Sequence, residues 1–511
     1  MSLDESLVAQ RREKLEQIRH MGLAAYPHRF AFTHTAAQIA EQFGGQSAEQ
    51  LEASRPQVRV AGRLMALRGH GKAGFAHLQQ DGARVQIYVR ADAVGDQGFA
   101  LWKLLDLGDL TGVTGYLFRT RTGELTVHAE RLELLAKDLL PWPEKWHGLQ
   151  DIEARYRQRY LDLVVNAPAR EIFVRRAKMM ESLRAQFGAR DYIEVETPMM
   201  QPLAGGAAAR PFVTHHQALD LALYLRIAPE LYLKRLVIGG LDRVYEINRN
   251  FRNEGVSTRH NPEFTMLEFY EAYSDYNVLM DWSQQLLAQT AKAVTGGEAV
   301  EYLGQQLDFA RLRRLRLREA VREFWPAAAW PPPSEAELGN AAAERAAAER
   351  YNRVASSAEN ARYRPVAIVP EAAPGVIAAA LFEAIAEGEL TAPTAIYDFP
   401  LATSPLAKAK DDEPDWVERF EIFAAGMEIA NGYSELNDPD EQRRRFEMQM
   451  RERERGNREA HVLDEDYLRA MHYGLPPTAG EGIGMDRLCM LLTNAASIRD
   501  VILFPLMRPE S

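Results

Sequence analysis

The sequence is poor in cysteine and in long apolar runs. Its 511 residues include one cysteine, Cys489, so neither an internal disulfide nor a zinc site built from several thiolates can form. No uninterrupted apolar run reaches the roughly 18 residues that a membrane-spanning helix needs. Residues 1–16 mix acidic and basic side chains without an apolar core, which disfavours a secretory signal. These absences predict a cytoplasmic protein with no membrane partner.

Basic residues are also in the minority. The chain has 61 Lys and Arg against 72 Asp and Glu, a formal net charge of −11, so contact with a nucleic acid requires a local patch. Residues 55–140 provide one, with 12 basic and 9 acidic residues. The hydrophobic share of 46% and the charged share of 26% are typical of globular proteins, and they predict a folded enzyme or binding protein.

Five short runs of strand-forming residues occupy this basic region. They cover residues 58–67, 75–80, 84–89, 110–118 and 125–135, with a helical stretch at 98–105. Asp81-Gly82 indicates a tight hairpin turn, because both residues tolerate positive φ. Five strands with a helix after the third are typical of an OB barrel, although other small antiparallel barrels would give a similar pattern.

The barrel strands present side chains suited to RNA. Alternation places Phe75 on one face of the second run and Gln86 and Tyr88 on one face of the third, with Arg63 and Arg68 flanking them. An aromatic ring can stack on an unpaired base while amide and guanidinium groups bond to its edge. This pattern favours binding of single-stranded RNA, with a core position for Phe75 as the alternative.

The chain divides into four segments by composition. We expect a helical extension at 1–54, the barrel at 55–140, a proline-marked linker at 141–165 and a mixed α and β domain at 166–511. Helices are predicted at 4–21, 169–190 and 376–387. Residues 305–392 are interpreted as a surface insertion, whose Ala-, Pro- and Glu-rich part at 326–348 predicts no particular fold.

The densest polar stretch is 245–264. We expect a strand at 243–247 and a return strand at 264–270, with Arg252, Arg259 and His260 at the sheet edge between them. Guanidinium groups form bidentate hydrogen bonds with phosphate or carboxylate, so the cluster suits an anionic ligand. A solvated charged loop would show the same composition.

A second polar stretch, 419–435, contains paired carboxylates. Glu421 and Glu428 are expected on neighbouring strands, where they could hold Mg²⁺, an ion that prefers oxygen ligands and retains waters and phosphate oxygens. Glutamates that simply face solvent are the alternative.

A glycine-rich stretch, 480–484, precedes an apolar helical pattern and places Arg487 near the start of that helix. The stretch matches neither the Walker loop nor the Rossmann fingerprint, so by itself it predicts little.

Taken together, these three stretches resemble the signature motifs of class II aminoacyl-tRNA synthetases, and in detail those of the bacterial lysine-specific family. Residues 205–212, 226–234 and 474–509 are also similar to that family. The resemblance covers nearly the whole chain and is weakest at 1–20 and 300–392. It implies an α+β fold, with a five-stranded OB-fold barrel followed by an antiparallel six-stranded sheet flanked by helices. It also implies a homodimer built around 172–198.

The resemblance implies a two-step reaction. L-lysine and ATP would form lysyl-adenylate and pyrophosphate, and the lysyl group would pass to the 3′-terminal adenosine of tRNA(Lys), with up to three Mg²⁺ ions per site. It further implies catalytic roles for Arg252 and Arg487, and ATP contacts from Arg252, Glu254, His260, Asn261, Phe264, Glu421 and Arg487. The implied metal ligands are Glu421 and Glu428. The implied lysine contacts are Gly206, Glu230, Glu268, Tyr270, Asn431, Tyr433 and Glu435. The implied anticodon contacts are Arg63, Phe75, Gln86 and Glu124.

The sequence also departs from that family at Met427, where many members have arginine, and at Tyr433, where phenylalanine is common. Three alternatives remain open. An aspartate-specific relative would need cations where this chain has Glu268 and Glu435. A non-catalytic RNA-binding paralogue would have no need of the motif arginines and glutamates. A ligase that modifies a protein such as elongation factor P would lack the barrel.

Overall fold

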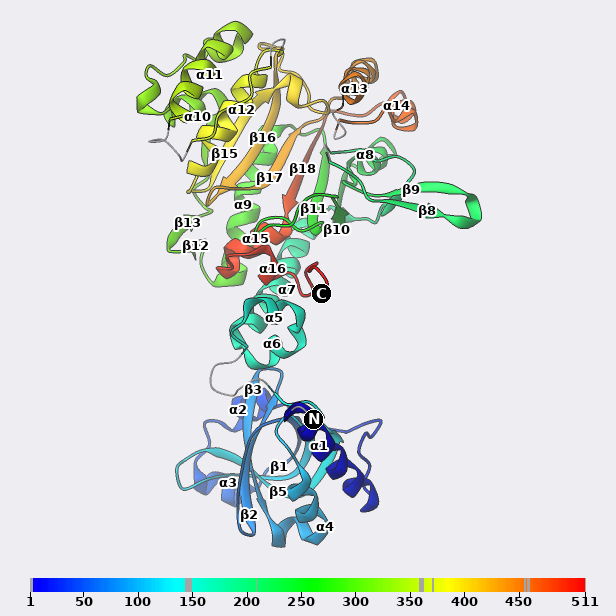
Figure 1. Cartoon of the computed structure of the whole chain (residues 1–511), viewed down its shortest axis with the longest axis vertical. Coiled ribbons are helices and arrows are strands. Elements are labelled where there is room, and N and C mark those ends of the chain that lie inside the picture. Colours follow the sequence, from blue (N-terminus) through cyan, green and yellow to red (C-terminus); the bar gives the residue numbers. More distant parts are fainter. Residues whose placement is uncertain are drawn as a thin grey trace. The chain divides into compact units, whose positions relative to one another are not determined.

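A computed structural model describes residues 3–142, 149–207, 209–357, 363–369, 372–454, 456 and 460–510. The chain forms two compact units, Met1–Arg170 and Glu171–Ser511 (Figure 1). Within the described ranges, no helix is both long and apolar enough to cross a membrane. Part of the predicted linker, 143–148, lies outside those ranges, and its later residues form α5 (Ile152–Arg157) and α6 (Arg159–Val165).

The first unit contains the predicted barrel. It is closed, in the order β1-β2-β3-β5-β4, which confirms the five strands. Their bounds are β1 (Gln57–His70), β2 (Ala73–Gln80), β3 (Ala83–Arg90), β4 (Leu110–Arg119) and β5 (Leu125–Ala136), with α4 (Ala91–Leu104) after the third. Asp81 and Gly82 have φ values of 50° and 82°, as the predicted tight turn requires.

Three helices precede the barrel: α1 (Leu3–His20), α2 (Ala36–Phe43) and α3 (Ala48–Ser54). The apolar face of α1, which includes Leu15 and Ile18, is buried in the barrel core. Lys14 Nζ pairs with Asp106 at 2.5 Å, so ionic contacts also hold the helix. Beneath it, the fully buried side chain of Lys137 bonds to Asp106 at 2.6 Å and to Asp109 at 2.7 Å.

The second unit is built on an eight-stranded sheet, in the order β14-β15-β16-β17-β18-β11-β10-β6. Its six central strands pair antiparallel, which confirms the predicted six-stranded sheet. They are β15 (Thr394–Pro400), β16 (Trp416–Ala424), β17 (Met427–Ser434), β18 (Thr478–Gly484), β11 (Glu263–Ala272) and β10 (Arg243–Phe251). Two short parallel strands, β14 (Arg313–Arg316) and β6 (Ile193–Glu194), form the edges of the sheet. Of these, β14 was not predicted because it is too short to show a period-2 pattern.

One face of this sheet is apolar and covered by helices. The helices α7 (Ala167–Gly188), α9 (Tyr276–Thr295) and α15 (Met485–Thr493) contribute to a single core with the sheet. Leu183, Leu286 and Leu488 are fully buried in it, against Phe269 and Ile483 of the strands. The opposite face of the same strands is therefore available for polar side chains.

The insertion forms a small helical layer that shares a second core with β15 and β16 of the large sheet. It contains α10 (Leu317–Glu323), α11 (Ala341–Ala355) and α12 (Val376–Ile385), so the predicted helix near its end is confirmed. The buried Glu344 accepts a 2.7 Å hydrogen bond from the Gly375 N–H and so caps α12.

The remaining strands and α-helices complete the second unit. They are β7 (Met200–Gln201), β8 (Val213–His216), β9 (Leu221–Leu225), α8 (Glu230–Ile238), β12 (Ala299–Tyr302), β13 (Gln305–Asp308), α13 (Pro439–Glu454), α14 (Glu465–Met471) and α16 (Ile498–Val501).

Candidate active site

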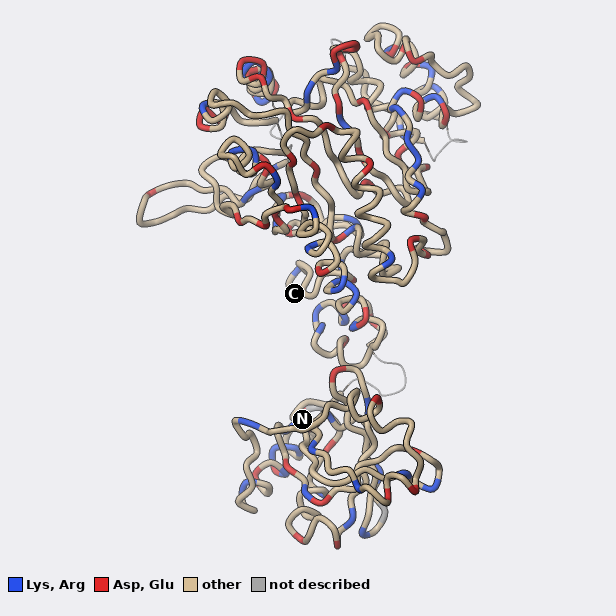
Figure 2. The backbone as a smooth tube through the Cα atoms, turned by 180° about the vertical axis from the view of Figure 1, so that it is seen from behind, with Lys and Arg blue, Asp and Glu red and all other residues tan. Residues whose placement is uncertain are grey.

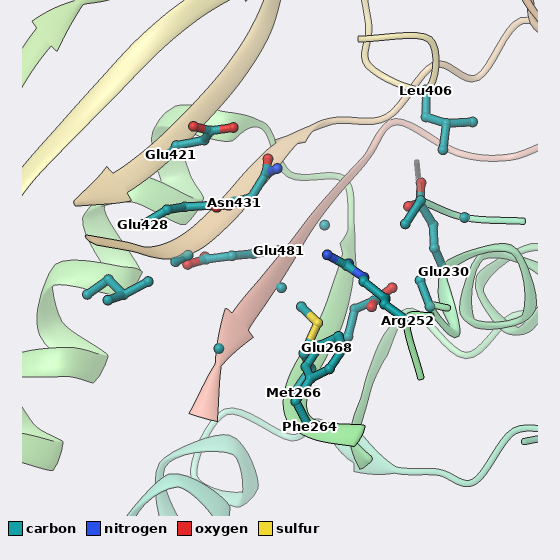
Figure 3. A pocket seen from close by; sticks show the side chains of 18 of the residues that line it. Glu230, Arg252, Phe264, Met266, Glu268, Leu406, Glu421, Glu428, Asn431 and Glu481 are labelled. Carbon is teal, nitrogen blue, oxygen red and sulfur yellow. The ribbon is translucent and has the colours of Figure 1, made fainter. Parts of the chain in front are cut away.

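A cavity of about 630 Å³ lies on the polar face of the large sheet. Figure 3 shows Glu421 and Glu428 on one side of it, Glu230 on the other, and Arg252 and Glu268 between them. Four alternate residues of β11 line the floor: Phe264, Met266, Glu268 and Tyr270. Because side chains alternate along a strand, one face of β11 runs from an aromatic ring to a carboxylate and a phenol.

Glycines at alternate positions of the neighbouring strand β18 leave it without side chains on the face that lines the cavity. A Cβ at Gly480 would lie 2.3 Å from the Tyr270 ring, and one at Gly482 would lie 2.8 Å from the side chain of Met266. The sequence pattern placed these glycines before a helix, but they belong to a strand that ends where α15 begins. Their role is to leave the cavity open.

A bulge in β17 brings three polar residues to the cavity. Its register with β16 shifts between Ile422 and Phe423. Since one extra residue reverses the alternation, Glu428 faces the same side as Asn431 and Tyr433, and all three line the cavity.

Arg252 supplies positive charge at the centre of the cavity. Its guanidinium carbon lies 5.1 Å from the centre of the Phe264 ring, and its backbone N–H donates to the Pro262 carbonyl at 2.9 Å. Burial lowers the pKa of Arg252, while Glu254 and Glu428 favour its charged form. Its buried Nε finds no hydrogen-bond partner among the described residues. An unpaired donor on a buried cation is suited to an anionic ligand.

A second cation, Arg487, lies at the start of α15. Its Nη1 donates to the Glu428 carbonyl at 2.6 Å, and its Nη2 lies 3.1 Å from His260 Nε2. Burial and then Arg487 lower the pKa of His260, so this imidazole is neutral near pH 7 and Nε2 can accept a hydrogen bond. The structure therefore brings together Arg252, His260 and Arg487.

The other residues expected to contact ATP line the same cavity: Glu254, Asn261, Phe264 and Glu421. Asn261 donates from Nδ2 to the Glu263 carbonyl at 2.6 Å, and its Oδ1 has no partner within the described ranges. Glu254 is exposed at the rim, next to Arg252.

Glu421 and Glu428 form an acidic edge of the cavity. Burial raises the pKa of Glu421 to about 8, and Glu428 adds to the rise, whereas the adjacent Arg419 opposes it. Arg419 pairs with Glu421 and donates to Asn431 Oδ1 at 3.2 Å. The described residues contain no group of three or more metal-ligating side chains. Two carboxylates that open onto a cavity nevertheless fit Mg²⁺, which completes its shell with water and phosphate oxygens.

The opposite end of the cavity is strongly acidic. Glu230, at the start of α8, accepts a 2.6 Å hydrogen bond from the Tyr433 hydroxyl. Glu268 accepts one from the Tyr270 hydroxyl at 2.8 Å. Burial, followed by the charge of Glu230, raises the pKa of Glu268 to about 8. These carboxylates suit a cationic group.

Gly206 also lines this acidic end. Its φ of 86° favours glycine, and a Cβ there would crowd Glu230 and Ala228 at 3.2 and 3.3 Å.

Glu435 lies beneath the acidic end and does not appear on the cavity wall. Its side chain is fully buried and forms an ion pair with Lys234, which is also fully buried. Lys234 Nζ donates to Glu230 as well, at 2.6 Å. Sequence reasoning did not identify Lys234, although its position four residues after Glu230 on a helix is a readable signal.

Two further lining residues, Gln449 and His461, were missed as well. His461 is 7% exposed, and its Nδ1 has no partner among the described residues. Burial lowers the pKa of His461 and keeps the ring neutral. The surrounding sequence has no periodic pattern that would have placed these residues in the cavity.

The barrel has a separate cavity, lined by polar groups from three strands. Gln86 Nε2 donates to Glu124 Oε2 at 2.8 Å, and His77 Nε2 lies 3.0 Å from the other oxygen of Glu124. Phe75 lies beside them on β2, partly buried, with its ring stacked on Tyr88 at 4.5 Å. Three of the four predicted anticodon contacts therefore form one cluster.

The fourth predicted contact, Arg63, is engaged elsewhere. Its Nη1 donates to the Gly108 carbonyl at 2.8 Å, and its guanidinium lies 5.0 Å from the Trp142 ring. Arg68 lines the barrel cavity with Gln86 and Glu124, whereas Arg63 does not. Arg68 is thus the arginine better placed for a ligand in this cavity.

Comparison with known proteins gives consistent matches for both units. The family described as "tRNA synthetases class II (D, K and N)" matches residues 151–508, and the family described as "OB-fold nucleic acid binding domain" matches residues 58–135. The chain is 50% identical over 508 residues to a protein of Azoarcus sp. (strain BH72) named "Lysine--tRNA ligase", covering 99% of this chain and 98% of that protein. Proteins of the same name from Moorella thermoacetica and Xanthomonas campestris pv. campestris are 48% and 50% identical, over 100% and 99% of this chain and 99% and 97% of their own.

Proposed function

The chain belongs to the class II tRNA synthetases of the D, K and N family, and on that premise we propose that it is a lysine–tRNA ligase. The enzyme activates L-lysine with ATP to give lysyl-adenylate and pyrophosphate. It then transfers the lysyl group to the 3′-terminal adenosine of tRNA(Lys).

One observation carries the choice of amino acid. Arg252, a cation whose buried Nε has no hydrogen-bond partner among the described residues, lines the same cavity as the carboxylates of Glu230 and Glu268. A lysine molecule has the complementary charges, with a carboxylate to face the arginine and ammonium groups to face the glutamates. Aspartate would place a second carboxylate against buried carboxylates, which is strongly unfavourable.

We assign the first step to charge stabilisation and positioning. Arg252 binds the lysine carboxylate and the α-phosphate, and stabilises the negative charge that builds up at phosphorus during in-line attack. Arg487 and neutral His260 hold the γ-phosphate, while Glu254, Asn261 and Phe264 bind the adenosine. No general base is needed, because the attacking carboxylate is already ionised.

The lysine contacts are assigned to the acidic end of the cavity. Glu268 and Tyr270 face the side-chain ammonium, with Glu435 behind them. Gly206, Glu230, Asn431 and Tyr433 bind the α-amino group and the stem. The hydrogen bonds from Tyr270 to Glu268 and from Tyr433 to Glu230 support this division, because they orient each carboxylate before lysine arrives.

We propose that Glu421 and Glu428 would hold Mg²⁺, with up to three ions per site. Phosphate and water oxygens would supply the remaining ligands. When bound, the metal neutralises phosphate charge and stabilises departing pyrophosphate. The register shift in β17 supports this assignment, since it turns both carboxylates to one side of the sheet.

For the barrel we propose recognition of the anticodon of tRNA(Lys). Phe75 supplies a stacking surface, and the paired Gln86 and Glu124 supply hydrogen bonds to a base edge. Arg63 was included among the predicted contacts. Its hydrogen bond to Gly108 favours a supporting role, with Arg68 contacting the RNA.

We also propose that the protein is a homodimer. Exposed large apolar residues occur on β6, on β7 and along the segment from β8 to β9, namely Ile193, Met200, Val213, Leu219 and Leu221, which are 42–69% exposed. The hairpin residues 213–225 contain one charged side chain, Asp220, and Figure 2 shows the hairpin almost free of charge. An apolar patch of this kind marks a protein interface. It lies close in sequence to 172–198, where the resemblance implies the interface.

Two further proposals concern organisation and location. The domain boundaries are those expected from composition: 1–54, 55–140, 141–165 and 166–511, with an insertion at about 305–392. We propose that the protein works in the cytoplasm. Its single cysteine is buried and forms no disulfide, which fits a reducing compartment, and ATP, lysine and tRNA are found there.

The decisive experiment is ATP–pyrophosphate exchange with each amino acid in turn, in the presence of Mg²⁺, followed by charging of tRNA(Lys). We expect exchange with lysine and transfer to tRNA. Exchange with aspartate or asparagine in place of lysine would contradict the pocket assignment. Absence of exchange with every amino acid would favour a non-catalytic RNA-binding protein.

A further inference from the structure

Lys234 is a charged group that the activation chemistry leaves unexplained. It follows Glu230 by one turn of α8, and its side chain is fully buried. Its ammonium donates to Glu230 Oε1 at 2.6 Å and forms an ion pair with Glu435, which comes from beyond the end of β17. A lysine so deep is stable only with such partners, because an unpaired buried charge is very costly.

The ammonium lies just beneath the cavity wall. Its nitrogen is 5.6 Å from the centre of the Tyr433 ring. The Tyr433 hydroxyl donates to the same oxygen of Glu230 that Lys234 bonds to. Glu230, Glu268, Tyr270 and Tyr433 line the cavity, and Lys234 does not. Lys234 therefore acts on a ligand only through the residues above it.

The charges at this end of the cavity can be counted. Glu230, Glu268 and Glu435 carry three negative charges when ionised, and Lys234 carries one positive charge. The net charge of −2 equals in magnitude the charge of the two ammonium groups of a lysine molecule. The carboxylate of that molecule is balanced separately by Arg252.

We propose that Lys234 is a built-in counter-ion that positions Glu230 and Glu435 and sets the charge of the pocket to match a diammonium substrate. This inference rests on the proposed function, since it concerns how lysine is recognised. It makes Lys234 a positioning residue, because the side chain touches the carboxylates and not the substrate.

The neighbouring ionisable groups are consistent with a permanent charge on Lys234. Burial lowers the pKa of Lys234, but Glu230 and Glu435 more than offset this and the net direction is upward. Burial also raises the pKa of Glu435, an effect that the charge of Lys234 opposes. Burial raises the pKa values of Tyr270, Tyr433 and Tyr467, and lowers that of His461, so these neighbours are neutral near pH 7. None of them can replace the positive charge of Lys234.

The test compares Lys234→Met with a matched control. Lys137 in the barrel unit is also a fully buried lysine between two carboxylates, so Lys137→Met removes an equivalent ion pair away from the amino-acid pocket. Both variants are compared with the wild type by ATP–pyrophosphate exchange, with KM measured separately for lysine and for ATP between pH 6 and 9.

For Lys234→Met, we expect the KM for lysine to rise by about 30-fold or more, as for truncation of a buried charge pair, with the KM for ATP changed by less than about threefold. The plot of log KM for lysine against pH becomes steeper by about one proton, because an extra carboxylate must lose its proton before the diammonium ligand binds. Lys137→Met leaves both quantities unchanged. Equal behaviour of the two variants would overturn the inference.

Two other measurements decide the matter if Lys234→Met fails to fold. Lys234→Arg keeps the charge, so its KM for lysine stays within about tenfold of the wild type. A folded arginine variant that no longer binds lysine would contradict the counter-ion role. In the wild type, calorimetry in buffers of different ionisation enthalpy gives the protons released when lysine binds. The charge count allows the release of no more than two protons, and the release of three protons would contradict the counter-ion role of Lys234.

These outcomes are separable from failure of the proposed function. If the wild type shows no lysine-dependent exchange, the function itself is wrong, and this result precedes any variant. If the wild type exchanges with lysine while Lys234→Met behaves like Lys137→Met, only the counter-ion role is wrong.

Discussion

The guanidinium of Arg252 lies over the face of the Phe264 ring, 5.1 Å from its centre. An aromatic face attracts the cation without accepting its N–H groups. The ring therefore fixes the position of the guanidinium while leaving donors free, in agreement with the unpaired Nε. Arg252 is thus prepared for an anion before any ligand binds.

Arg252→Ala should abolish most adenylate formation. Loss of one preorganised donor to a developing charge costs about 3–4 kcal/mol, or about 10²–10³ in rate. Pyrophosphate exchange measures this directly. Arg249→Ala is the control, since Arg249 is an exposed arginine on β10, which ends one residue before Arg252, and its side chain pairs with Glu263 at 3.8 Å. Near-normal exchange by Arg252→Ala would exclude the assigned role.

In the barrel, Phe75→Ala should weaken charging of tRNA while leaving adenylate formation intact. Loss of one stacking contact costs about 1–3 kcal/mol in RNA binding. The measurements are the KM for tRNA and pyrophosphate exchange on the same preparation. Phe32→Ala removes an exposed aromatic ring elsewhere in the first unit and should change neither. Loss of both activities in Phe75→Ala would indicate a packing role.

The two candidate arginines of the barrel should behave differently. Arg68→Ala should weaken tRNA binding. It should also reduce the slope of log K for tRNA binding against log salt concentration by about one, as for a lost phosphate contact. Arg63→Ala should instead lower the thermal stability of the barrel, because it removes the hydrogen bond to Gly108 and the contact with Trp142. The reverse result would restore Arg63 as the RNA contact.

Lysine recognition should depend on pH through Glu268. Its pKa of about 8 means that the empty pocket holds this carboxyl protonated near pH 7, whereas an ammonium ligand requires the ionised form. The kcat/KM for lysine should therefore rise from pH 6.5 toward pH 8 and then level off. Glu268→Gln should lower kcat/KM and flatten the profile. A flat wild-type profile would contradict this.

Glu481 should make stability depend on pH. Its side chain lies on the helix-covered face of β18, where Ser283 donates to it, and burial raises its pKa to about 8. Below pH 4.5 the carboxyl is protonated in both the folded and unfolded chain. As pH rises from 4.5 to 8, only the unfolded chain ionises, so folding is progressively disfavoured.

Glu481→Gln removes this effect. Relative to the wild type, its free energy of unfolding should increase by about 3 kcal/mol between pH 5 and pH 8, measured by urea denaturation. A pH-independent difference between the two proteins would show that Glu481 is ionised in the folded chain.

The dimer proposal predicts a change in mass. Leu221→Glu should convert a dimer to a monomer in analytical ultracentrifugation, because it places a charge within the apolar patch. Met448→Glu is the matched control, since Met448 is 60% exposed on α13, away from the patch. A wild type that sediments as a monomer would rule out the proposal.

Most of the fold could be predicted from the sequence. The barrel was readable because alternating strands and the Asp81-Gly82 turn are local signals. Arg252, Glu421 and Arg487 could be assigned because their motifs resemble a known family. The face that each strand presents was harder to predict, since the bulge in β17 changes the alternation without changing composition.

Lys234 was missed for a different reason. A lysine on an amphipathic helix usually faces solvent, and its burial depends on Glu435, which is 201 positions away in the chain. The fold of residues 326–348 was missed because alanine-rich segments show little contrast between their faces.

The glycines of β18 have a consequence for protein engineering. At Gly480, Gly482 and Gly484, β18 contributes only backbone atoms to the cavity wall. These positions therefore have no side chain that could be shortened to enlarge the cavity. Redesign for a longer or bulkier amino acid must therefore draw its new volume from β11, β17 and α8. At the acidic end of the cavity these elements supply Glu268, Tyr270, Tyr433 and Glu230, so there the enzyme's amino-acid preference and its pocket charge will have to be redesigned together.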